Sequence, residues 1–244
     1  MQTTGATYQA LLAEAHTTET RLRINNATYY ESKIMENSLV VKHALFSGDT
    51  PAVGGAVAGE IEVSLRGVAS NDVSRKAELR PEVRLVSLDG QTASEWIAQG
   101  VYNVDKRSYN KQTGVLTLHG YDKMLATEQW YTGSVGTGGV TDITIVNRVC
   151  TQVGIELDSE TAAFFTASGR SYVIAAPTDY TCRELLQTIA GCYGGNWMMT
   201  AVGKLRLVLL DSIPAETNYL VDGVGNAITF GNATTSEEVR ILVG

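Results

Sequence analysis

The sequence is poor in cysteine, in long apolar runs and in clustered basic residues, and each shortage excludes a class of protein. Its three cysteines, Cys150, Cys182 and Cys192, form no CxxC pair, so neither a disulfide framework nor a zinc knuckle is indicated. The longest apolar runs are far shorter than the roughly 20 residues of a membrane-spanning helix. The net charge is -7 and no basic cluster is present, which argues against a nucleic-acid-binding surface. The first residues lack the basic and apolar regions of a secretory signal, so we expect no export signal.

Catalytic and metal-binding motifs are also scarce. The three histidines, His16, His43 and His119, lie far apart on different predicted elements and in no HxH or HxxxH pattern. The sequence has no GxSxG elbow, no GxxxxGK[ST] loop and no strand-linked GxGxxG. Cys182 is the one reactive candidate, because the predicted helix that it opens would lower the pKa of its thiol, but a buried packing role is the simpler interpretation. We therefore predict no catalytic, cofactor-binding or metal-ligating residue and no cofactor.

Two groups of side chains leave alternatives open. A carboxylate of the Glu60-Ile61-Glu62 segment could pair with Asp211 or Asp222 across a cleft, as the two carboxylates of a glycosidase do. Alternate strand positions place Glu60 and Glu62 on one face, however, where a solvated sheet surface is the simpler explanation. Four aromatic residues could stack on carbohydrate if they were exposed together, and each alone is typical of a core or interface anchor: Trp96, Trp130, Tyr131 and Trp197.

The first half of the chain is dominated by strand patterns. With 244 residues and a hydrophobic fraction of 44%, the chain is long enough for two or three modules with a real core. Helical spacing of apolar residues predicts a helix at residues 7–16, and from Arg21 the period changes to two. Further strands are expected at residues 38–45, 59–65, 83–88, 96–104 and 114–119. Short strands with turn residues between them predict an antiparallel β-barrel or sandwich.

The second half returns to helical spacing after a glycine-rich stretch. Asp142 is expected to cap a helix that Gly154 ends, and another short helix is expected to begin near Ser159. Thr181 and Glu184 have the spacing of a capping box for a third helix. Glycines then stop this helix, and residues 196–200 and 204–210 predict a β-hairpin. Residues 227–230 and 239–243 are two more expected strands, which either rejoin an earlier sheet or begin a module that continues beyond Gly244.

These patterns predict an α+β, β-rich fold. It comprises an antiparallel β-barrel or sandwich, then a small α/β domain of helices plus a β-hairpin, and the start or remnant of a second β-domain. We expect five segments: an N-terminal helix (1–18), a first β-domain (19–132), a glycine-rich linker (133–140), the small α/β domain (141–212) and strands of a second, possibly truncated, β-domain (213–244).

Two blocks of sequence resemble a known family. The first contains GVYNVD (residues 100–105), GVLTLHGYDKML (114–125) and EQWY (128–131), in which a strand leads into a short helix through a Tyr-Asp-x-Met step. The second is PTDYTCRELLQTIAGCYGGNWMMTAVGKLRLVLL (177–210), a helix, a double-glycine stop and a hairpin whose second strand begins with Gly-Lys-Leu. Both resemble the baseplate hub and tail-tip structural proteins of tailed phages and prophages. Their order and spacing agree with that family over roughly residues 25–210.

The resemblance implies a structural subunit and not an enzyme. It implies a tube-type first β-domain and a homotrimeric ring that connects the tail tube, or a distal tail protein, to a spike or tip protein. The protein would then be made in the cytoplasm of a bacterial host and reside in the tail of the virion. We expect the acidic excess partly to line the lumen, where DNA would pass without specific binding. The alternatives are a β-rich carbohydrate-binding module of a tail tip and, less favoured, a peptidoglycan hydrolase.

Overall fold

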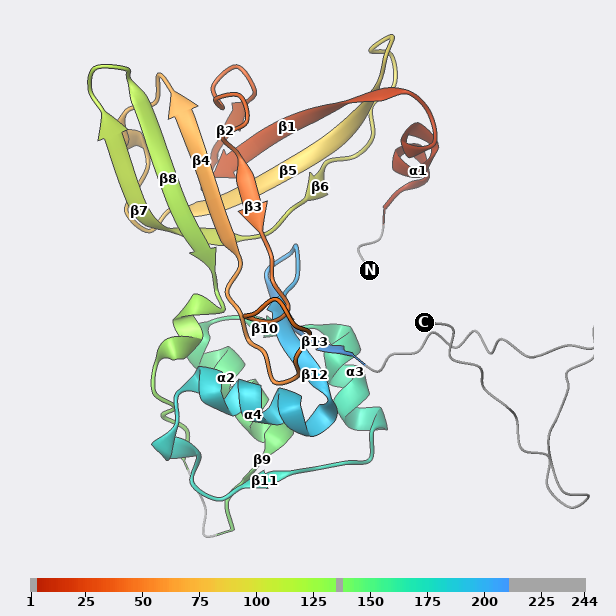
Figure 1. Ribbon diagram of the computed structural model, residues 1–244, viewed down its shortest axis with the longest axis vertical. Coiled ribbons are helices and arrows are strands. Elements are labelled where there is room, and N and C mark those ends of the chain that lie inside the picture. Colours follow the sequence, from red (N-terminus) through yellow and green to blue (C-terminus); the bar gives the residue numbers. More distant parts are fainter. Residues whose placement is uncertain (1–3, 135–137, 211–244) are drawn as a thin grey trace, which may run out of the picture. The chain divides into compact units, whose positions relative to one another are not determined.

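Antiparallel strand pairing dominates the first half of the chain, as the alternating pattern predicts. The computed structural model describes residues 4–134 and 138–210, and the expected strands at 227–230 and 239–243 lie outside the described residues. The α+β, β-rich class is confirmed (Figure 1). The elements of the first half are α1 (Ala6–Leu12), β1 (His16–Ile24), β2 (Ala27–Tyr30), β3 (Val40–Lys42), β4 (Glu60–Arg66), β5 (Glu78–Ser87), β6 (Ile97–Ala98), β7 (Tyr102–Asn110) and β8 (Val115–Asp122), with short 3-10 turns at Ser70–Asp72 and Leu125–Glu128.

One large sheet contains all eight of these strands. Its order is β2-β1-β5-β7-β8-β4-β3, and β6 pairs with β5. β5 and β7 share only the pairs Glu78↔Asn103 and Leu79↔Tyr102, and the sheet bends there, since β1 and β5 run at a steep angle to β7 and β8 (Figure 1). Inward positions on both sides of the bend meet in a common core, whose fully buried members include Leu22, Ile61, Val63, Leu65, Leu79, Leu116 and Leu118. Among the described residues no strand joins β2 to β3, so the expected barrel or sandwich is an open, bent sheet without a closed barrel.

Two expected elements have different bounds in the structure. The expected strand at 96–104 is split into β6 and β7 at Gly100, which has a φ of +144°. A Cβ at this position would lie 2.3 Å from the hydroxyl oxygen of Tyr102, so only glycine fits the break. The first helix ends at Leu12, earlier than expected, because residues from His16 onward pair with β5.

The second half folds into a small α/β module. Its elements are β9 (Val140–Thr141), α2 (Asp142–Val153), β10 (Glu156–Leu157), α3 (Ser159–Ala167), β11 (Val173–Ile174), a 3-10 turn (Pro177–Asp179), α4 (Cys182–Tyr193), β12 (Gly195–Met199) and β13 (Lys204–Leu209). β12 and β13 form the expected hairpin, and β10 adds to β13 in parallel. Figure 1 shows α2 and α4 beside this hairpin. Their apolar faces and the hairpin share a core with Ile145, Val149, Leu185, Ile189 and Trp197.

The ends of these helices follow the sequence closely. Thr181 and Glu184 form the predicted capping box at the start of α4. Gly154 and Gly194 end α2 and α4 in the left-handed region, with φ of 71° and 70°. One prediction is wrong by a position: Thr141 occupies the N-cap of α2, and Asp142 is its first helical residue. The carboxylate of Asp142 instead accepts hydrogen bonds from the hydroxyl of Tyr193 and from two backbone N–H groups.

The segment between β3 and β4 belongs to the small module in space. The backbone N–H of Trp197 donates to the carbonyl of Gly55 at 2.8 Å, and the side chain of Asn196 donates to the carbonyl of Ala52 at 2.7 Å. Ala56 is buried in the core of this module. A segment that sequence order assigns to the first β-domain therefore completes the packing of the second.

Candidate assembly surface

The structure disfavours covalent chemistry at Cys182. Its side chain is fully buried under α4, in the core of the small module. Burial raises the pKa of the Cys182 thiol to about 11, although a backbone hydrogen bond opposes the rise. The packing role is therefore the correct interpretation of this cysteine.

The other residues considered for chemistry do not converge. Glu60 and Glu62 lie on the same outward face of β4, and Glu60 has Lys42 and His119 within 4.0 Å. Asp211 and Asp222 lie outside the described residues. Across residues 4–134 and 138–210, no three His, Cys, Asp or Glu side chains gather closely enough to hold a metal ion. In the same residues no helix is long and apolar enough to cross a membrane.

The four aromatic residues do not form a shared stacking platform. Trp197 and Tyr131 are buried, at 0% and 2% exposure, whereas Trp130 is 63% exposed. The ring of Trp96 is covered by two guanidinium groups, which place their central carbons 4.2 Å (Arg21) and 4.7 Å (Arg84) from its centroid. A shared stacking platform would require rings that are open and adjacent, which these four do not provide.

A buried polar cluster explains the Tyr-Asp-x-Met step of the first sequence block. Asp122 ends β8, and its carboxylate accepts backbone hydrogen bonds from Gly59 at 2.8 Å and from Met124 at 2.9 Å. Burial raises the pKa of Asp122 to about 6, although these hydrogen bonds and the charges of His43 and Arg183 oppose the rise. Asp122 thus fixes the turn by which the chain leaves the large sheet.

The two sequence blocks that carry the resemblance join at this turn. Arg183, in the second block, donates to the carbonyl of Met124 at 2.7 Å and forms an ion pair with Glu128 at 2.6 Å. The backbone N–H of Cys182 donates to the carbonyl of Gln129 at 2.9 Å. Residues far apart in sequence therefore form one structural unit.

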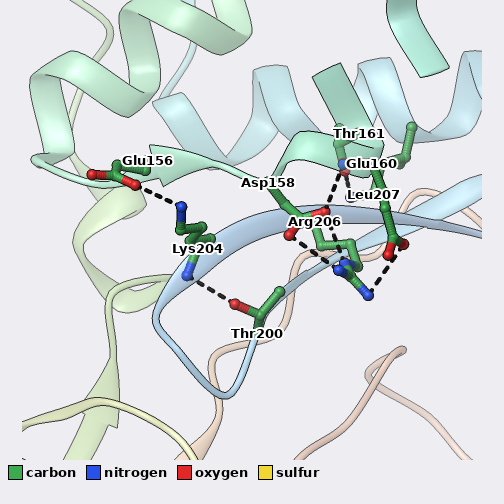
Figure 2. Close-up of polar contacts among 8 residues, drawn as sticks. All are labelled: Glu156, Asp158, Glu160, Thr161, Thr200, Lys204, Arg206 and Leu207. Atoms are coloured by element: carbon green, nitrogen blue, oxygen red, sulfur yellow. Dashed lines mark hydrogen bonds and ion pairs between the residues drawn. The ribbon is translucent and has the colours of Figure 1, made fainter. Parts of the chain in front are cut away.

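A second polar cluster fixes the start of α3 to the hairpin (Figure 2). The guanidinium of Arg206 donates two hydrogen bonds to Asp158, at 3.0 and 3.1 Å, and lies 3.4 Å from Glu160. Asp158 also caps α3 by accepting from the N–H of Glu160. Burial opposes ionisation of Asp158, but the hydrogen bond and charge of Arg206, together with the backbone N–H groups of Glu160 and Thr161, lower the pKa of Asp158. The N–H of Leu207 donates to the hydroxyl of Thr161 at 2.9 Å, which adds a further tie.

The Gly-Lys-Leu sequence at the start of β13 has a structural role. Gly203 turns the hairpin with a φ of +80°, and Leu205 is fully buried. Lys204 forms a 2.8 Å ion pair with Glu156 on the parallel strand β10, and its backbone N–H donates to the hydroxyl of Thr200 (Figure 2). These contacts give the Gly-Lys-Leu segment a role in holding the module together.

Open strand edges are the remaining surface feature. β2 and β3 end the large sheet, and β2 covers only residues 21–24 of β1. Residues 16–20 of β1 pair with β5 on one side, and no described strand pairs with them on the other. Unpaired strand edges present backbone donors and acceptors that readily pair with another chain. We therefore identify these edges as the candidate assembly surface.

The fold is similar to parts of phage and prophage tail proteins. The 43 kDa tail protein of prophage MuSo2 from Shewanella oneidensis matches with a TM-score of 0.47 and 13% identity, over 78% of this chain and 54% of that chain. A tail protein from Neisseria meningitidis MC58 matches with a TM-score of 0.47 and 12% identity, over 78% and 51%. A chain of the virion of a native gene transfer agent particle matches with a TM-score of 0.32 and 11% identity, over 56% and 51%.

This chain spans about half the length of the solved proteins that it matches. No protein-family model and no curated protein matches it. Similarity at these identities and TM-scores describes the fold and assigns neither a family nor a function.

Sequence reasoning missed the residues that shape this surface and its surroundings. The sequence did not indicate that Arg21 and Arg84 would cover the ring of Trp96, because both contacts depend on strand register. The open edge of β1 was also invisible, since a strand pattern does not specify which sides are paired. Alternating charges on Glu19 and Arg21 were the one available signal of an outward face, and these residues do pair across to Arg84 and Glu82.

Proposed function

We propose that this protein is a structural subunit of a phage or phage-like tail. In this role it forms a homotrimeric ring of the baseplate hub or tail tip, between the tail tube or a distal tail protein and a spike or tip protein. It has no catalytic role there. The single observation that carries the proposal is the open edge of the large sheet, because an uncovered strand edge can pair with a strand of a neighbouring chain.

The sequence resemblance supports the same role. Its two blocks are separated by a helical segment, and the structure unites them through the contacts of Arg183 with Met124 and Glu128. The two blocks therefore form one structural unit in this chain, which supports the proposal. The proposal keeps the order predicted from the sequence, in which a tube-type β-domain precedes the small α/β domain.

The mechanism is the completion of strand edges by neighbouring chains. Each contact with a partner chain would bury backbone groups that the isolated subunit leaves to water, so assembly stabilises the subunit. The acidic excess of the chain would partly line the lumen and repel DNA phosphates. A ring interior that is basic or neutral would overturn the lumen proposal.

Electron microscopy of intact particles tests the assignment. An affinity tag at the N-terminus of the full-length gene product, decorated with a labelled antibody fragment, should place label at the distal end of the tail tube. Three-fold averaging should resolve three copies. Label on the head, along the whole tube or absent from purified particles would contradict the proposal.

A further inference from the structure

The gap in the large sheet contains a groove with an apolar floor. Its volume is about 600 Å³, and it lies between the free side of β1, the free side of β3 and the connection that joins β2 to β3. Val41 of β3 and Val83 of β5 belong to its lining. Both occupy core-facing positions. Val41 pairs with the buried Ile61, and Val83 lies two residues before the buried Leu85, on the same face of β5.

These core-facing side chains are only half-buried. Val41 and Val83 keep intermediate exposure, as do Ile34 and Leu39, which pack against the core from the connection between β2 and β3. Apolar residues at inward positions of a sheet are normally buried in the core, so an added strand that closes the gap would cover more of these side chains. The groove therefore has the floor that a missing strand would cover.

Backbone groups along one wall of the groove point toward it. The N–H of Thr20 is turned away from β5, because it donates to the carboxylate of Glu31 at 2.8 Å across the free side of β1. Backbone direction alternates along a strand, so the N–H and C=O groups of Thr18 point to the same side. Thr18 is exposed and has no strand partner there among the described residues.

The rim of the groove is acidic. Glu31 and Glu36 line it, and its other polar members, Thr20, Asn37 and Gln99, are neutral. The carboxylate of Glu31 accepts the hydrogen bond from the N–H of Thr20. A strand that pairs with β1 here would have to replace this carboxylate with one of its own carbonyl oxygens. A segment with cationic side chains would both displace this carboxylate and neutralise the rim.

We propose that this groove receives an extended segment of a neighbouring tail protein, with apolar side chains at every second position and lysine or arginine between them. The inference rests on the proposed assembly role and names one partner surface within it. The apolar side chains cover the floor at Val41 and Val83, and the backbone of the segment pairs with β1 at Thr18 and Thr20. Pairing on that side continues the large sheet past its open edge.

A synthetic peptide tests the proposal on the full-length chain. The probe is the nonapeptide KVTVKVTVK, with a fluorescent label, and the control is KTVVVVKTK, which has the same composition without alternation. Anisotropy titration should give saturable binding of the alternating peptide, with a Kd about tenfold or more below that of the control peptide. On binding, amide hydrogen exchange should slow at Thr18. Equal binding of the two peptides, or no binding, overturns the proposal.

Two pairs of variants locate the binding. Thr18→Pro removes an outward N–H of β1 and should weaken the alternating peptide about tenfold. Thr28→Pro is the matched control, because Thr28 lies on the exposed outer edge of β2, and it should change affinity less than about twofold. Leu39→Lys places a charge on the floor and should also weaken binding, whereas Leu88→Lys, at a 68% exposed site outside the groove, should not. Equal effects within either pair would refute the location.

Further experiments test the role of the acidic rim, distinguish a partner segment from a second copy of the chain, and keep this inference separate from the proposed assembly role. Glu36→Gln should weaken KVTVKVTVK but not the uncharged peptide SVTVSVTVS, and an equal effect on both refutes the role of the rim. Circular dichroism and urea midpoints verify that each variant folds. If light scattering shows that the chain alone dimerises and that Thr18→Pro abolishes the dimer, a second copy is the occupant and the proposal is overturned. Peptide binding and tail location are independent readouts, so failure of this inference is distinguishable from failure of the assembly role.

Discussion

Replacing Asp122 with asparagine should change how the stability of the protein depends on pH. Asp122 is 5% exposed, and its carboxylate accepts backbone hydrogen bonds from Gly59 and Met124. Burial raises the pKa of Asp122 from 3.8 to about 6 in the folded protein. Between these two values the folded state holds a proton that the unfolded chain has released, so the free energy of unfolding falls as pH rises.

The size of this effect follows from the shift. A difference of about 2 pH units corresponds to about 3 kcal/mol, which is fully present below pH 3.8 and lost once pH has risen through about 6. Asparagine has a similar shape and does not titrate, so it removes the pH-dependent part. Its amide can accept from only one of the two N–H groups, which costs about 1–3 kcal/mol at every pH.

Urea denaturation followed by tryptophan fluorescence, at steps from pH 4.5 to 7.5, measures both parts. The wild type should exceed Asp122→Asn in stability most at pH 4.5, and this excess should shrink by about 2 kcal/mol toward pH 7.5. Asp49→Asn, at an exposed carboxylate, is the control and should leave the pH dependence of the wild type unchanged. Parallel curves for the wild type and Asp122→Asn would refute the reasoning.

Two further substitutions test the small module by urea denaturation. Gly194→Ala should destabilise the protein by about 1 kcal/mol, because its φ is +70° and a Cβ there meets no atom within 4 Å, so the cost is conformational. Gly191→Ala, inside α4 with the same open space, should stabilise it by about 0.5–1 kcal/mol, and a loss at both sites would contradict this account. Trp197→Phe should cost about 2–4 kcal/mol, since Trp197 is fully buried and its indole N–H donates to the carbonyl of Leu186 at 2.7 Å. A cost below about 1 kcal/mol would show that the site collapses around the smaller ring.

Much of the fold follows from short-range patterns. The capping box at Thr181 and the helix stops at Gly154 and Gly194 are correct because they depend on backbone groups within a few positions. Strand alternation also identified β4 and the β12–β13 hairpin. The cap of α2 was misplaced because threonine and aspartate stand side by side there, and both are good N-caps.

The candidate site was much less predictable. The sequence did not distinguish Trp197 from Trp130, yet Trp197 is fully buried while Trp130 is exposed. The expected lowering of the pKa of Cys182 is not found, since burial in the surrounding core raises this pKa. Each of these outcomes depends on neighbours that are distant in sequence.

The sequence by itself therefore determined the elements of this protein: its strands, helices, caps and stops, and its lack of catalytic motifs. These depend on side-chain periodicity and on local backbone preference. Only the tertiary structure decided that the large sheet stays open at β1 and β3, that Ala56 packs in the second core, and that Asp122 is buried. The physical reason is that strand pairing, burial and pKa are set by contacts between residues far apart in the chain, which periodicity does not encode.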